Sequence, residues 1–261
     1  MKKVRAIIFL IFSLLAGTYQ VSAAEKTELL KIDWSFNGLF GKFDRGSLQR
    51  GYQVYSEVCA ACHSMKYLSY RNLSEKGGPE FSIEQAKAIA ASFEITDGPN
   101  ADGEMFTRPG KLSDKFLMPY ENDKAAQAAN GGAYPPDLSL ITKARAGGAD
   151  YLYSLLVGYG EAPKNIDVKE DLYYNSAYYG NWIAMPQPLY VDSVSYSDGH
   201  EASIEQMAAD VTEFLSWTAE PEMEVRKRTG IATVSFLLIM VILSYFAKVQ
   251  IWSNIKKNNT T

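Results

Sequence analysis

Both cysteines of the chain lie in one five-residue motif, Cys59-Ala60-Ala61-Cys62-His63. The spacing C-x-x-C-H is the attachment pattern of a c-type haem. Two thiols about one helical turn apart can add to the two vinyl groups of one haem. The residue that follows, His63, can then present its imidazole to the iron. The motif therefore predicts one covalently bound haem c, with Cys59 and Cys62 as attachment points and His63 as a metal ligand.

The same residue types admit two other interpretations, a redox-active dithiol and half of a zinc site. A thioredoxin-like dithiol belongs in a βαβ setting, and the sequence around the motif shows no such pattern. A zinc site needs a fourth ligand beyond the two cysteines and the histidine of the motif. The sequence favours haem over both.

The second axial position of the iron separates electron transfer from ligand binding. A methionine thioether raises the redox potential and suits electron transfer, whereas an open position suits gas or peroxide binding. His200 lies in a polar loop beside Asp198 and Glu201. Four methionines are set aside because they lie too close to His63, on a packed helix face or at the C-terminal apolar run: Met65, Met207, Met223 and Met240. Three candidates remain: Met105, Met118 and Met185.

Met118 and Met185 each precede a proline, which favours a stiff, extended backbone. Met185 lies in the apolar loop 182–188, ahead of the last helix before the C-terminal apolar run. Its chemical setting favours it over Met118 as the ligand. An open or labile site would instead indicate a haem sensor or gas-binding protein, and this alternative stays open.

Several helices are predicted to position these residues. Leu48, Tyr52, Tyr55 and Val58 recur at helical spacing and lead into Cys59. Capping boxes at 82–85 and 203–206 predict two further helix starts. The first helix has Ile83, Ala86, Ala90 and Phe93 on one face, and the second has Ile204, Met207, Val211, Phe214 and Leu215. A short buried helix is expected at 151–157, and loops at 97–148 and 158–200.

Composition excludes several classes of protein. The chain has 261 residues, of which 47% are hydrophobic and 21% charged, unlike collagen, a coiled coil, a polytopic membrane protein or a disordered chain. The net charge of −4 conceals an uneven distribution, because all 30 acidic residues lie between Glu25 and Glu224. Residues 25–225 hold 17 basic residues against these 30, a formal charge of −13. Such a body repels nucleic acid and attracts cationic partners.

The two ends of the chain are apolar and basic. Residues 1–24 combine a basic start, an apolar run and small residues at 22–24, as in a cleavable signal peptide; an organelle transit peptide or an uncleaved anchor is the alternative. Residues 229–247 are free of charge, and the run is long enough to cross a membrane. Basic residues flank it evenly, so the export signal decides the orientation. We expect a haem domain at 25–224 outside, a single-pass anchor at 225–252 and a cytoplasmic tail at 253–261.

Several further blocks accompany the haem motif in a defined order: Arg50-Gly51-Tyr52-Gln53-Val54-Tyr55, His63-Ser64-Met65, Arg108 to Asp114, Ala129 to Ser139, Ala144 to Gly148, Ile183-Ala184-Met185, Ala219 to Glu222 and Arg226-Lys227-Arg228. In this order they resemble the cytochrome c1 family, the haem subunits of the cytochrome bc1 complex. C-x-x-C-H alone is common to all c-type cytochromes, but the resemblance covers nearly the whole chain. The resemblance implies a mainly α fold with long loops, similar to a class I c-type cytochrome domain, with one C-terminal transmembrane helix.

The resemblance also implies roles for single residues. Met185 matches the distal iron ligand of the family, opposite His63. Arg145 matches an arginine near a haem propionate, and Asn130, Pro135 and Pro136 match a loop that lines the haem. Neither proline of the pair has a backbone N–H, so the pair offers a stiff apolar wall. Many bacterial members carry an additional disulfide, for which this chain has no cysteines.

As a member of this family, the chain would carry single electrons in quinol–cytochrome c oxidoreductase, without a catalytic site of its own. The implied partners are a cytochrome b subunit, a Rieske iron–sulfur protein as donor, a cytochrome c with a basic patch as acceptor, and the lipid bilayer, in a dimeric complex. The expected location is a bacterial inner membrane, with the haem domain in the periplasm. A free-standing membrane-anchored carrier is the alternative.

Overall fold

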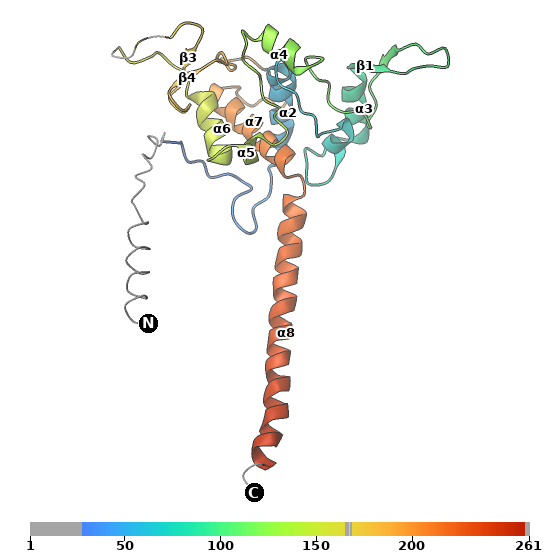
Figure 1. The fold of residues 1–261 in the computed structure, drawn as a ribbon, viewed down its shortest axis with the longest axis vertical. Coiled ribbons are helices and arrows are strands. Elements are labelled where there is room, and N and C mark those ends of the chain that lie inside the picture. The colour runs from blue at the N-terminus through green and yellow to red at the C-terminus, as the bar shows by residue number, and fades with distance from the viewer. Residues whose placement is uncertain (1–27, 165–166, 168, 259–261) are drawn as a thin grey trace, which may run out of the picture.

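The computed structural model describes residues 28–164, 167 and 169–258, and the predicted signal peptide at 1–24 lies outside them. A helical domain sits at one end of a single long helix (Figure 1). The helices are α2 (Arg45–Glu57), α3 (Ile83–Ala91), α4 (Asp123–Ala129), α5 (Ile141–Ala144), α6 (Gly148–Val157), α7 (Ile204–Ala219) and α8 (Met223–Asn258), with 3-10 turns η1 (Cys59–Ala61) and η2 (Tyr70–Ser74). Two antiparallel pairs, β1 (Glu94–Asp97) with β2 (Phe106–Pro109) and β3 (Tyr173–Tyr174) with β4 (Trp182–Ile183), are the only strands in this part of the chain. The predicted mainly helical class is confirmed.

Helices α2 and α7 form the centre of the domain and cross in close contact. Gly51 permits this approach, because a Cβ at this position would lie 2.1 Å from the carbonyl oxygen of Asp210 and 2.7 Å from the Cβ of Phe214. The crossing is also held by charge, since Arg50 donates to both carboxylate oxygens of Asp210 at 2.9 and 3.0 Å. Any side chain larger than hydrogen at 51 would push the two helices apart.

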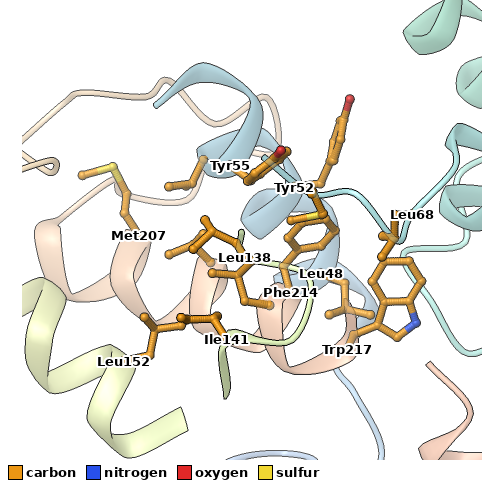
Figure 2. Packing of buried hydrophobic residues seen from close by; sticks show 14 of the residues in the cluster. Leu48, Tyr52, Tyr55, Leu68, Leu138, Ile141, Leu152, Met207, Phe214 and Trp217 are labelled. Atoms are coloured by element: carbon orange, nitrogen blue, oxygen red, sulfur yellow. The ribbon is translucent and has the colours of Figure 1, made fainter. Parts of the chain in front are cut away.

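An aromatic cluster fills the space around this crossing (Figure 2). The ring of Tyr52 meets Phe116 and Phe214 edge-on, with centroids 6.1 and 5.8 Å apart. Tyr70 stacks on Phe116 at 4.9 Å, and Trp217 packs against Phe214 at 5.6 Å. These residues come from α2, η2, α7 and the loop after β2, so one core joins the segments on both sides of the haem motif.

Most predicted helices are present, with corrections at their ends. The capping box at Ser82 forms, but Ile83 is exposed and Phe93 lies beyond the helix, so only Ala86 and Ala90 of that face are buried. At Ser203 only half of the box forms: the Gln206 amide N–H donates to Ser203, while the Gln206 side chain donates to Asp210 instead.

The helix predicted at 151–157 begins earlier, at Gly148. The expectation of loops at 97–148 was wrong in part, because this region contains β2, α4 and α5. Segments of four to seven residues are too short for hydrophobic periodicity to reveal them. The described residues within 158–200 are loop apart from β3 and β4.

Helix α8 leaves the domain and extends alone (Figure 1). Met223–Ser253 is long and apolar enough to cross a membrane, and none of its apolar window is buried by the rest of the chain. At 1.5 Å per residue this helix exceeds the thickness of a bilayer core. The predicted C-terminal membrane helix is therefore present.

Candidate haem site

The haem motif begins where α2 ends. Helix α2 stops at Glu57, and Cys59–Ala61 continue as the tight turn η1. The amide N–H groups of Cys62 and His63 both donate to the Cys59 carbonyl, at 3.1 and 2.9 Å. This turn brings both thiols and the imidazole to one end of α2.

The two thiols are free and differ in exposure. Cys59 is partly buried and Cys62 is exposed. Burial raises the pKa of the Cys59 thiol to about 12, and the neighbouring Cys62 adds to the shift. Cys59 therefore stays protonated at neutral pH unless another group reacts with it or takes its proton.

The imidazole of His63 is oriented by a backbone acceptor 73 residues away. Its Nδ1 lies 2.8 Å from the carbonyl oxygen of Pro136, a distance at which Nδ1–H donates. Burial lowers the pKa of His63, which keeps the ring neutral. With the proton on Nδ1, the lone pair of Nε2 is available to a metal, as in metal-binding histidines that donate their other N–H to a carbonyl. The residues of the motif thus fit a haem iron.

Asp137 holds the loop that carries this carbonyl. Its Oδ2 accepts from the Ser64 hydroxyl and the Lys66 amide, both at 2.8 Å, and its Oδ1 accepts from the Ser139 amide at 3.0 Å. The Leu138 amide also donates to the Ser64 carbonyl at 2.9 Å. Burial raises the pKa of Asp137, but these hydrogen bonds outweigh it and hold the pKa below its usual value.

The sequence predicted no role for Asp137, and Pro136 was expected only as an apolar wall. One signal for Asp137 was present, because aspartate side chains commonly accept from the backbone N–H two residues on, as Asp137 does from Ser139.

Met185 lies on a separate segment, two residues after β4. Its side chain is partly buried, and its backbone carbonyl accepts from the Tyr159 hydroxyl at 3.0 Å. Strand β4 pairs with β3, and Trp182 meets the ring of Tyr174 edge-on at 5.9 Å. These contacts hold the Met185 backbone near the C-terminal end of α6.

The other methionines are placed as follows. Met65 and Met207 are fully buried in the core, and for Met207 this fits the predicted packed helix face. Met105 and Met118 are both largely exposed, at 61% and 48%. His200 is exposed and pairs with Asp198 at 3.1 Å, which fits the expected solvated loop.

Arg145 ends α5, and its guanidinium is exposed. Among the described residues no carboxylate pairs with it; its Nη1 donates only to the Ala144 carbonyl, at 3.2 Å. Burial raises the pKa of Tyr151, and the charge of Arg145 opposes this rise. An accessible cation of this kind can accept a propionate partner.

Asn130 caps α4, and its side-chain amide donates to the Ala126 carbonyl at 2.7 Å and to the Tyr120 hydroxyl at 3.1 Å. Pro135 and Pro136 follow and are partly buried. The structure thus brings Cys59, Cys62, His63 and Pro136 together. Within the described ranges, no hydrogen bond joins His63 to Asn130, Arg145 or Met185.

Comparisons with known proteins extend over nearly the whole chain. The model of the Cytochrome C1 family matches residues 34–255. The chain is 50% identical over 225 residues to "Cytochrome c1 1, heme protein, mitochondrial" of Arabidopsis thaliana, covering 85% of this chain and 72% of the relative. It is 45% identical over 244 residues to "Cytochrome c1" of Rhodospirillum rubrum, covering 87% and 89%.

A third relative is longer. The chain is 48% identical over 240 residues to "Cytochrome b/c1" of Bradyrhizobium diazoefficiens, which covers 85% of this chain but only 35% of that protein. Because the family model matches residues 34–255 and the relatives are 45–50% identical, the family is shown. The chain belongs to the cytochrome c1 family, the electron-carrying haem subunits of the cytochrome b–c1 complex.

Proposed function

We propose that this chain binds one haem c covalently through Cys59 and Cys62, and that His63 and Met185 would hold its iron. The observation that carries this proposal is the hydrogen bond from His63 Nδ1 to the Pro136 carbonyl. It fixes the tautomer and the ring orientation that a haem iron requires, directly beside two free thiols at haem-attachment spacing.

When bound, the haem supplies a one-electron redox centre. The chain contributes the environment: His63 is held neutral and oriented, and the soft Met185 thioether would favour the reduced state. Arg145 would pair with a propionate, while Asn130, Pro135 and Pro136 would line the haem edge. The proposed role of the chain in the complex is electron transfer.

We further propose the topology of an exported, anchored domain in a bacterial inner membrane. The signal-like segment 1–24 supports export, so that residues 25–224 face the periplasm. Helix α8 would cross the membrane once over 225–252, and residues 253–261 would lie in the cytoplasm.

The proposed electron donor is a Rieske iron–sulfur protein, and the acceptor is a cytochrome c with a basic patch. Support for the acceptor comes from the charge of −13 on residues 25–225, because complementary charge steers association and raises the on-rate. Within the membrane, the chain would contact a cytochrome b subunit, in a complex that is dimeric.

Purification from native membranes in mild detergent tests the proposal. We expect the chain to co-purify with a cytochrome b and a Rieske protein, and to keep its haem on a denaturing gel. A variant with Cys59→Ala and Cys62→Ala should lose the haem under the same denaturing conditions. Haem released from the wild-type chain by denaturation would refute covalent attachment. A chain purified alone, with covalent haem, would indicate a free-standing carrier.

A further inference from the structure

The loop between Trp34 and Phe43 exposes two large apolar side chains. Leu39 is 61% exposed and Phe40 is 78% exposed. The aromatic residues at the base of this loop are packed inward instead: Phe36 lies 5.7 Å from Trp34 and 5.0 Å from Phe43, measured between ring centroids. We call residues 35–42 the Leu39 loop. Its tip is thus apolar and uncovered, while its base belongs to the aromatic core.

The Leu39 loop is compact. The Lys42 amide donates to the Ser35 carbonyl at 3.1 Å and closes its neck. At Gly41 the backbone passes so close to the Asn37 carbonyl oxygen that a Cβ would lie 1.9 Å from it. Because the neck is closed and the turn is tight, the loop presents its tip in a defined place.

Contacts with helix α8 determine where the Leu39 loop lies relative to the membrane-spanning segment. Lys227, in the first turns of α8, donates through Nζ to the carbonyls of Phe36 and Gly41, at 2.6 and 3.1 Å. Glu224, one turn earlier, accepts from the Phe43 amide at 3.0 Å and from Arg45 at 2.9 Å. The loop descends beside the start of α8 (Figure 1).

Lys227 is also the penultimate charged residue before the membrane run. Only Arg228 separates it from the uncharged residues 229–247. The contacts of Lys227 therefore place the Leu39 loop at the level where α8 enters the membrane. Exposed Lys42 and Arg228 flank this level, in contrast to the acidic body, and cations there suit the phosphates of lipid headgroups.

We propose that the tip of the Leu39 loop, Leu39 and Phe40, inserts into the lipid interface and forms a second membrane contact beside α8. One helix leaves a domain free to tilt and rotate above a bilayer. A second contact, fixed to the helix by Lys227, sets the orientation of the haem domain relative to the membrane plane. The occupant is phospholipid, because the tip is apolar, its flanks are basic and its position is continuous with the transmembrane helix.

Depth measurement by spin labelling tests this proposal. The test rests on the proposed haem attachment, because haem at Cys59 and Cys62 leaves an engineered cysteine as the sole reactive thiol. The full-length, haem-loaded chain carrying Phe40→Cys is labelled with a nitroxide and placed in phosphatidylcholine vesicles. Tyr179→Cys is the matched control: it is 72% exposed and lies between β3 and β4, away from α8 (Figure 1).

We expect the label at 40 to collide more with oxygen, which dissolves in lipid, than with a water-soluble nickel chelate. The ratio of the two accessibilities should be several-fold higher at 40 than at 179. Equal ratios would overturn the proposal, since the tip would then lie in water. A label shielded from both reagents would also overturn it, because the tip would then be covered by protein. Labelling of the unmutated chain would reveal free motif thiols and count against haem attachment alone.

A second variant tests the attachment to α8. Lys227→Met removes both hydrogen bonds from Nζ to the loop. We expect the label at 40 to become more mobile and its oxygen-to-nickel ratio to fall towards that at 179. Lys124→Met, which removes an exposed lysine on α4, should change neither quantity. An unchanged ratio in Lys227→Met would show that α8 does not place the loop.

Discussion

The two proposed iron ligands are held in very different ways. On the His63 side, residues 63–66 and 136–139 are joined by hydrogen bonds to the imidazole, to the carboxylate of Asp137 and between the backbones. On the Met185 side, the described residues show one side-chain hydrogen bond to the Met185 carbonyl and a pair of two-residue strands. The thioether of Met185 itself is fixed by none of these contacts.

This difference indicates that the polypeptide positions one iron ligand and that the cofactor helps to position the other. The polypeptide alone orients His63, whose lone pair must face the iron once the two thiols have reacted. Met185 is a flexible side chain with three rotatable bonds, so we expect the bond to iron to contribute to its final position. Disturbing the two sides should therefore affect different quantities: the redox potential on the Met185 side and the stability of the fold on the Asp137 side.

The largest effect is expected from Met185→Ala. Loss of a thioether ligand should lower the midpoint potential by about 100 mV or more, since axial ligands tune haem potentials over about 0.8 V. The covalent haem should remain, because Cys59, Cys62 and His63 are untouched. Redox titration and the reduced optical spectrum measure both. Met118→Ala is the control, as a methionine that also precedes proline. If Met118→Ala shifts the potential and Met185→Ala does not, the assignment is wrong; carbon monoxide binding by the wild-type chain would favour a sensor.

The sequence predicted which side chains form this site, but not the contacts that support them. The spacing of Leu48, Tyr52 and Tyr55 correctly indicated the helix that leads into the motif. The acceptor for His63 could not be found in this way, because it is a backbone carbonyl, and every residue has one. Its identity depends on a loop 73 residues away folding back onto the motif. Long-range pairing of this kind leaves no periodic pattern in the sequence.

Competition between neighbouring polar groups explains why the second predicted capping box forms only in part. Ser203 to Gln206 reads as a complete capping box, but Gln206 also lies one turn from Asp210, and its side chain donates there at 3.1 Å. Asp210 is almost fully buried and also binds Arg50, so an additional donor to this carboxylate outweighs the cap. Local signals name the possible partners of a side chain, and tertiary packing selects among them.

An intermediate effect is expected from Asp137→Asn. The new amide NH2 would face the Ser64 hydroxyl and the Lys66 N–H, the two donors whose hydrogen bonds Oδ2 of Asp137 now accepts. We expect a loss of about 1–2 kcal/mol in the free energy of unfolding at pH 7, the low end for charged hydrogen bonds because the group is partly exposed. Denaturant titration of the haem-loaded protein measures it. Asp102→Asn, at an exposed turn, should change little.

The pH dependence of this loss in unfolding free energy provides a second test of Asp137. The pKa of Asp137 is lowered in the folded state, so its contribution to stability is present above the unfolded-state pKa near 3.8 and disappears as the pH falls through the folded-state value. The difference between wild type and Asp137→Asn should therefore shrink as the pH falls below about 4. A difference that stays constant over this range would show that the charge of Asp137 does not hold the loop.

The smallest effect is expected from Arg145→Gln, and it concerns the redox potential. A cation near the haem favours the reduced, less positive state, so its removal should lower the midpoint potential. One exposed charge is worth on the order of 1 kcal/mol at an effective dielectric constant between those of protein and water, which corresponds to a few tens of millivolts. The shift should weaken at high salt, because Arg145 is exposed and screening acts on exposed charges. Lys124→Gln, which removes an exposed charge on α4, controls for the net charge of the domain. An equal shift in both variants would mean that Arg145 acts only through net charge, and a salt-independent shift would place its charge in a buried contact with the propionate.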